Sequence, residues 1–182
     1  MERHVRGALF VDYVRMIRAH KAAPWTRHLQ ASDMRYLEAR IEPATWYPME
    51  TFERMGLAIL TEIARDQLAI VEAFGHASVE GLLNQYPMLL APDCPRDTIM
   101  RFQSFRSGFF DFPAFETCEI SDHSARIQIE YQMGMRAEEA ACHQSVGFFI
   151  RLLEASGAAH GRVDFASRRW AGDRSTVLAL SY

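Results

Sequence analysis

The chain has 182 residues and a formal net charge of −3; about half of the residues are hydrophobic and a quarter are charged. This length allows one domain with a sizeable core, and the mixture is that of a soluble globular protein. The negative charge and the lack of a basic stripe exclude a nucleic-acid-binding surface. No segment reaches the roughly 20 consecutive apolar residues of a membrane span.

Three widely spaced cysteines, Cys94, Cys118 and Cys142, predict reduced thiols rather than a disulfide framework. The first residues lead into a mixed segment instead of an apolar core segment, so we expect no signal peptide. Both features predict a cytoplasmic protein.

The first 112 residues are predicted to be mainly helical, because apolar residues recur at helical spacing. Pro43 and Pro48 stiffen the segment that carries Trp46 and Tyr47, and both rings are expected to be buried. Gly75 and the residue after it are expected to separate two short helices. The expected helices cover residues 8–20, 34–40, 49–65, 68–74, 77–84 and 96–108.

The last third predicts two strands, a helix and two more strands. Residues 125–131 alternate strictly between apolar and polar side chains, as half-buried strands do, and residues 115–120 form the preceding strand of a hairpin. Residues 138–156 have the spacing of one long helix, and strands are expected near 163–165 and at 176–182.

The predicted fold class is α+β: an N-terminal helical part packed on a four-stranded antiparallel sheet with one long helix. The helical part is expected to span residues 1–112 and the strand-strand-helix-strand-strand module residues 113–182, both within one compact domain.

The residues that carry chemistry are scattered. No histidine or cysteine pair has the spacing of a metal site. Cys142 and His143 are adjacent on a helix and point about 100° apart, which makes them a poor nucleophile and base. His76 is either a binding residue or a partly exposed residue at a helix junction. The sequence therefore predicts no catalytic residue, no metal site, no cofactor and no enzymatic activity.

A stretch rich in aromatic residues leads from the helical part into the sheet; its phenylalanines are Phe102, Phe105, Phe109, Phe110, Phe112 and Phe115. Such a stretch forms either a solid boundary between the helices and the sheet or an apolar ligand pocket at that boundary, which we call the helix–sheet seam. In the second case the expected ligand-binding residues are Trp46, Phe102, Phe105, Phe109 and Tyr131, with Arg106 as a polar anchor.

Two resemblances support this fold. Pro113-Ala114-Phe115, residues 127–131 and Gly147-Phe148-Phe149 resemble the C-terminal part of the haem–nitric-oxide/oxygen-binding fold and of the related 4-vinyl-reductase-type domains. The chain as a whole is similar to a paralogous protein family that is abundant in myxobacteria. That similarity is carried by residues 5–10, by Trp46-Tyr47-Pro48 with Phe52, and by residues 147–150 and 155–158.

The haem-binding residues of the first family are not matched. Its haem binders carry a Tyr-x-Ser-x-Arg motif, and the corresponding run here is Tyr131-Gln132-Met133-Gly134-Met135, with Arg136 one residue late. Those proteins also carry a histidine on the helix before the Pro-x-Phe stretch, whereas residues 97–112 contain none. The resemblance thus implies a sensor scaffold in which haem is not expected.

Three functional hypotheses follow. The first is a non-enzymatic cytoplasmic regulatory or sensory module that binds a small apolar or amphipathic ligand at the helix–sheet seam. The second is a signalling adaptor that binds a protein partner or a second copy of itself, with residues 176–182 as an open sheet edge. The third is a haem-based gas sensor with an atypical ligand to the iron.

Overall fold

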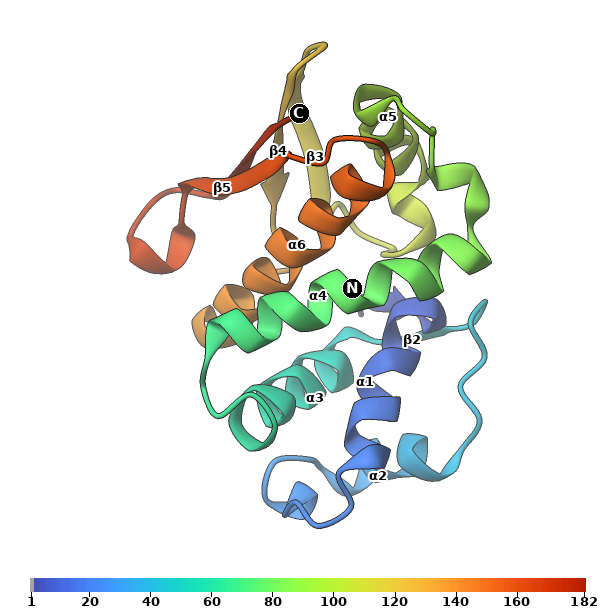
Figure 1. The fold of residues 1–182 in the computed structure, drawn as a ribbon. Coiled ribbons are helices and arrows are strands. Elements are labelled where there is room, and N and C mark those ends of the chain that lie inside the picture. The colour runs from blue at the N-terminus through green and yellow to red at the C-terminus, as the bar shows by residue number, and fades with distance from the viewer. Residues whose placement is uncertain (1) are drawn as a thin grey trace.

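A computed structural model describes residues 2–182; Met1, the first residue of the expected helical part, lies outside the described residues. The predicted α+β class is confirmed: α6 crosses a four-stranded antiparallel sheet, α5 packs beside that sheet, α3 and α4 pack against α6, and α1 packs against α3 (Figure 1). The helices are α1 (Gly7–Ala19), α2 (Ala31–Glu38), α3 (Met49–Glu62), α4 (Leu68–Gln85), α5 (Pro95–Phe105) and α6 (Met135–Ala155). The strands are β1 (His4–Arg6), β2 (Trp46–Pro48), β3 (Phe115–Ile120), β4 (Ser124–Ile129), β5 (Arg162–Ser167) and β6 (Thr176–Ser181).

The larger sheet has the strand order β3-β4-β6-β5, with every neighbouring pair antiparallel. Ile127 and Ile129 of β4 are buried, as the alternating pattern predicted. The expected open edge at residues 176–182 is wrong, because β6 pairs with β4 on one side and β5 on the other. The real edges, β3 and β5, each contain a register shift, and such irregularities discourage pairing with another chain.

A second, two-stranded sheet joins β1 to β2 at the start of the chain. Val5 and Tyr47 are buried there, as expected for Tyr47. Trp46 is only partly buried, in contrast to the prediction, and the Arg6 guanidinium lies 3.8 Å from the centre of its ring. A cation over an aromatic face stabilises both groups without full burial.

Helix α4 is continuous through Gly75, so the two short helices predicted for residues 68–84 are one. The glycine serves a close helix contact: a Cβ at Gly75 would lie 1.8 Å from the carbonyl oxygen of Gln144 on α6. Reciprocally, a Cβ at Gly147 would lie 1.9 Å from the carbonyl oxygen of Glu72. His76 lies on the surface of this helix pair, where its Nε2 is 3.1 Å from Glu154 Oε2.

One hydrophobic core cluster includes residues from both halves of the chain, such as Phe10, Phe109, Ile127 and Phe149. The proposed division after residue 112 stays a prediction. Within residues 2–182, no helix combines the length and the apolar character that crossing a membrane requires.

Candidate ligand-binding site

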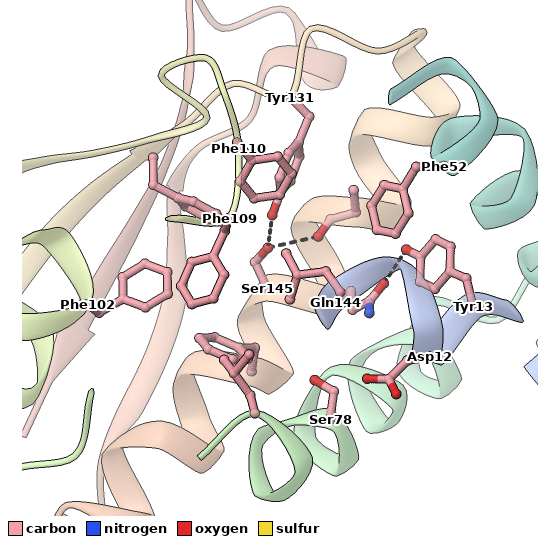
Figure 2. A pocket seen from close by; sticks show the side chains of 15 residues that line it. Asp12, Tyr13, Phe52, Ser78, Phe102, Phe109, Phe110, Tyr131, Gln144 and Ser145 are labelled. Carbon is pink, nitrogen blue, oxygen red and sulfur yellow. Dashed lines mark hydrogen bonds between the residues drawn. The ribbon is translucent and has the colours of Figure 1, made fainter. Parts of the chain in front are cut away.

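A cavity of about 80 Å³ lies at the helix–sheet seam, enclosed by side chains from α1, α3, α4, α5, α6 and the sheet (Figure 2). Its lining is mostly apolar. The lining residues are Leu9, Asp12, Tyr13, Phe52, Ser78, Leu82, Phe102, Phe109, Phe110, Phe115, Tyr131, Ala141, Gln144, Ser145 and Phe148.

The aromatic wall of the cavity comes from α5 and the segment that follows it. Phe102 belongs to the buried face of α5, and a single 3-10 turn then brings Phe109 and Phe110 inward. The rings of Phe102 and Phe109 stack with centroids 5.8 Å apart, and Phe115 of β3 meets Phe102 edge-on at 5.4 Å. Such contacts order large side chains, so this wall is expected to be rigid.

Two hydrogen-bonded pairs of side chains give the cavity its main polar features. The Tyr131 and Ser145 hydroxyls lie 2.7 Å apart, and Ser145 also donates to the Ala141 carbonyl at 2.9 Å. The Tyr13 hydroxyl donates to Gln144 Oε1 at 2.6 Å (Figure 2). Burial raises the pKa of both tyrosines, so both phenols are neutral near neutral pH.

The mouth of the cavity lies where α1, α4 and α6 meet. Leu9, Asp12, Ser78, Gln144 and Phe148 are the lining residues that remain partly exposed. Burial raises the pKa of the Asp12 carboxyl, although the nearby Arg15 guanidinium opposes this shift. The carboxyl group at the entrance therefore keeps its proton to a higher pH than an ordinary aspartate.

The structure brings three of the six predicted ligand-binding residues to this cavity: Phe102, Phe109 and Tyr131. The other three lie elsewhere. Phe105 packs behind Phe109, with ring centroids 5.1 Å apart. The Arg106 side chain turns back to donate to the Gln103 carbonyl at 2.7 Å, and Trp46 stacks under Arg6 in the small sheet. A role in ligand binding stays a prediction for all six.

The sequence interpretation missed the side of the cavity formed by α1, α3 and α6, including Tyr13, Phe52 and Gln144. Tyr13 follows Phe10 by three residues and precedes Ile17 by four, so helical spacing alone marks it as buried. No local signal connects it to Gln144, because their contact joins positions 131 residues apart.

The histidine and cysteine candidates form no recognisable reaction centre. His143 Nδ1 lies 2.6 Å from Glu72 Oε1, across the α4–α6 contact. Burial raises the pKa of the neighbouring Cys142 thiol, which disfavours the nucleophilic thiolate. Over residues 2–182, no group of three or more His, Cys, Asp or Glu side chains is placed to hold a metal ion.

Comparison with solved structures finds that the fold of this chain is similar to that of H-NOX proteins. The chain is similar to an Fe(II) unliganded H-NOX protein from K. algicida, with 12% identity, a TM-score of 0.63, and coverage of 97% of this chain and 95% of that one. It is also similar to an H-NOX protein from S. oneidensis in the Fe(II)NO ligation state, with 11% identity, a TM-score of 0.61, and coverage of 97% and 98%. A mutant of T. tengcongensis H-NOX matches at 8% identity and a TM-score of 0.62, with coverage of 97% and 96%. The chain thus has an H-NOX-like fold.

No protein-family model and no curated protein matches the chain. At 8 to 12% identity the structural neighbours establish the fold alone.

The seam cavity does not fit a haem group. A cavity of about 150 Å³ is known to bind benzene, and a haem is several times larger than benzene, whereas this cavity measures about 80 Å³. Among the described lining residues there is no histidine to bind iron and no lysine or arginine to pair with propionates. Tyr13 and Tyr131, the lining phenols, are neutral and hydrogen-bonded to side chains.

The loop between β4 and α6 is equally unsuited to haem propionates. The two oxygens of the buried Glu138 carboxylate accept hydrogen bonds from the backbone N–H groups of Tyr131 and Met133, at 2.8 and 2.9 Å. Glu53 accepts one from Gly134 at 2.9 Å. Two carboxylates therefore order this loop, and like charge at short range opposes a further anion.

Proposed function

We propose that this chain is a sensory module that binds a small molecule with an apolar body and one hydrogen-bonding group in the cavity at the helix–sheet seam. The observation that carries the proposal is the cavity itself: a mainly aromatic lining with the hydrogen-bonded pairs Tyr131–Ser145 and Tyr13–Gln144 at its wall. Few polar groups in a mostly apolar lining are typical of small-molecule sites.

The H-NOX-like fold supports a sensing role by analogy, because one similar structure is a ligated H-NOX protein, in its Fe(II)NO state. The proposal assigns the module no catalytic step and no haem, and it locates the protein in the cytoplasm. The alternative of an adaptor that pairs through residues 176–182 loses its support, because β6 is already paired on both sides.

The size of the cavity limits the ligand. The space of about 80 Å³ is roughly half of the 150 Å³ cavity that binds benzene, so it holds only a few heavy atoms without side-chain movement. Short alcohols and ketones match this volume, and their oxygen can exchange hydrogen bonds with the hydroxyls of Tyr131 and Ser145.

We expect a Leu82→Phe substitution to abolish the binding of such ligands, because the larger ring fills the cavity that Leu82 lines. In the unsubstituted protein, a ligand at 100 times its Kd raises the free energy of unfolding by about 2.7 kcal/mol. Thermal unfolding across a series of C3 to C5 alcohols and ketones measures this shift.

The matched control is Leu83→Phe, one residue along α4 and absent from the cavity lining, which should keep the ligand-induced shift. If no member of the series raises the Tm of the unsubstituted protein or binds in ligand-observed NMR, the proposed function is wrong.

A further inference from the structure

The ring of Tyr13 occupies a flat slot beside the seam cavity. It lies parallel to the ring of Phe52 on α3, with centroids 4.2 Å apart and planes 10° from each other. A Cβ at Gly56 would be only 3.1 Å from Tyr13 Cε2, so the missing side chain leaves room for the ring edge. The hydroxyl at the end of the ring donates to Gln144 Oε1. The slot thus holds a planar ring by stacking and accepts one hydrogen bond at its far end.

The Tyr13 ring lines two cavities. The second is a space of about 20 Å³, lined also by residues of α3, α4 and α6 and by Met133. Tyr13, Phe52, Ala141 and Gln144 line both spaces. Figure 2 shows Tyr13 beside Phe52 at one side of the larger cavity, linked to Gln144. Movement of the Tyr13 side chain would therefore enlarge both spaces.

We propose that this slot binds a planar aromatic molecule with one N–H or O–H donor, of the size of indole, which displaces the Tyr13 ring. This inference rests on the proposed function and names the ligand class of the same site. The vacated slot adds the volume of a benzene-like ring to the spaces of about 80 and 20 Å³ that the Tyr13 ring lines. Together these exceed the about 150 Å³ that holds benzene.

The chemistry of the slot selects the donor. Gln144 Oε1 already accepts one hydrogen bond, from Tyr13, and a ligand that displaces the hydroxyl must supply a replacement. A partly buried acceptor that a ligand shields from water without donating to it pays a desolvation cost that nothing offsets. The ligand therefore needs an N–H or O–H at the edge of its ring, and a ring of the same shape without a donor binds weakly.

The position of Tyr13 also allows its release. Its neighbours Leu9 and Asp12 on α1 are partly exposed at the mouth of the larger cavity. The ligand gains the space of about 80 Å³ only if the side chain rotates past that mouth toward solvent, with the helix backbone in place.

The test compares indole with benzofuran, which has the same shape but no N–H donor. Kd is measured by isothermal titration calorimetry on the full chain and on Tyr13→Phe. We expect indole to bind the unsubstituted protein at least tenfold more tightly than benzofuran. We expect Tyr13→Phe to bind indole about fivefold more tightly than the unsubstituted protein, because displacing the ring no longer breaks a hydrogen bond.

The matched control is Tyr47→Phe. Tyr47 is similarly buried and its hydroxyl accepts a hydrogen bond from the backbone N–H of Glu42 at 2.9 Å, but it lines neither cavity. Its substitution should leave the Kd for indole unchanged. Equal Kd values for indole in the unsubstituted protein and Tyr13→Phe would overturn displacement of Tyr13.

A further readout separates this inference from the proposed function. Selective labelling of the tyrosine rings should show the Tyr13 resonances shifting on indole binding. If short alcohols bind but indole does not, the seam cavity is a site and the aromatic slot is not. If neither class binds, both the inference and the proposed function are wrong.

Discussion

A Gly75→Ala substitution is expected to destabilise the protein by about 3 kcal/mol or more, which is at the upper end of the cost of overpacking a core. The added Cβ would lie 1.8 Å from the Gln144 carbonyl oxygen and 2.8 Å from its carbonyl carbon, far inside van der Waals contact. The obstructing atoms belong to the backbone of α6 and cannot rotate away, so the two helices must separate. Urea denaturation measures the loss as a lower midpoint at an unchanged m-value.

Gly81→Ala on the same helix is the control, because a Cβ there meets nothing within 4 Å. Alanine is favoured over glycine in a helix by up to about 1 kcal/mol, so this variant should be more stable than the unsubstituted protein. An unchanged midpoint for Gly75→Ala would contradict the close approach of α4 and α6.

An Asp33→Ala substitution is expected to cost about 3–5 kcal/mol, the usual effect of removing one partner of a buried ion pair. The Asp33 side chain is fully buried and accepts hydrogen bonds from Arg54 Nε and Nη2, both at 2.8 Å, and from the Thr51 hydroxyl. It also accepts one from the Gln30 backbone N–H at the start of α2. Loss of the carboxylate leaves the Arg54 charge without this partner and removes the cap of α2.

Glu50→Ala provides the control for this second substitution. Glu50 lies 3.8 Å from Arg54, but 78% of its side chain is exposed, and exposed ion pairs contribute little. Its removal should change the free energy of unfolding by less than about 0.5 kcal/mol. Equal effects of the two substitutions would show that burial does not strengthen the Asp33–Arg54 pair.

The Asp33 carboxylate also makes the free energy of unfolding depend on pH. Burial raises the pKa of Asp33, but the hydrogen bonds of Arg54, Gln30 and Thr51, with the Arg54 charge, outweigh burial and lower it below 3.8. A depressed pKa contributes stability that is present above the unfolded-state value and is lost as pH falls through the folded-state value. The difference in unfolding free energy between the unsubstituted protein and Asp33→Asn should therefore shrink as pH falls below about 4.

The strands of the last third were the part of the fold most accessible to prediction. A half-buried strand repeats every two residues, so residues 125–129 placed Ile127 and Ile129 on the buried face without any knowledge of their partners. The same information cannot order the strands, because pairing joins distant positions; β6 lies between β4 and β5 although it comes last in the chain.

At Gly75, the local sequence pattern and the packing of the folded chain favour different structures. Gly75 weakens a helix locally and was interpreted as a break, yet the structure uses it for the contact with α6. Similarly, the ion pair between Asp33, in the first turn of α2, and Arg54, from α3, depends on how α2 and α3 pack.

The sequence by itself determined most of the helices and the four strands of the larger sheet, and it located one aromatic wall of the candidate site, with Phe102 and Phe109. Local patterns suffice for this, because burial of apolar side chains imposes a period on each element. Only the tertiary structure decided that the aromatic seam encloses a cavity, and that Tyr13 and Gln144 complete it across 131 positions. Whether side chains fill a space depends on how elements from distant parts of the chain pack against one another, and that packing leaves no periodic trace in the sequence.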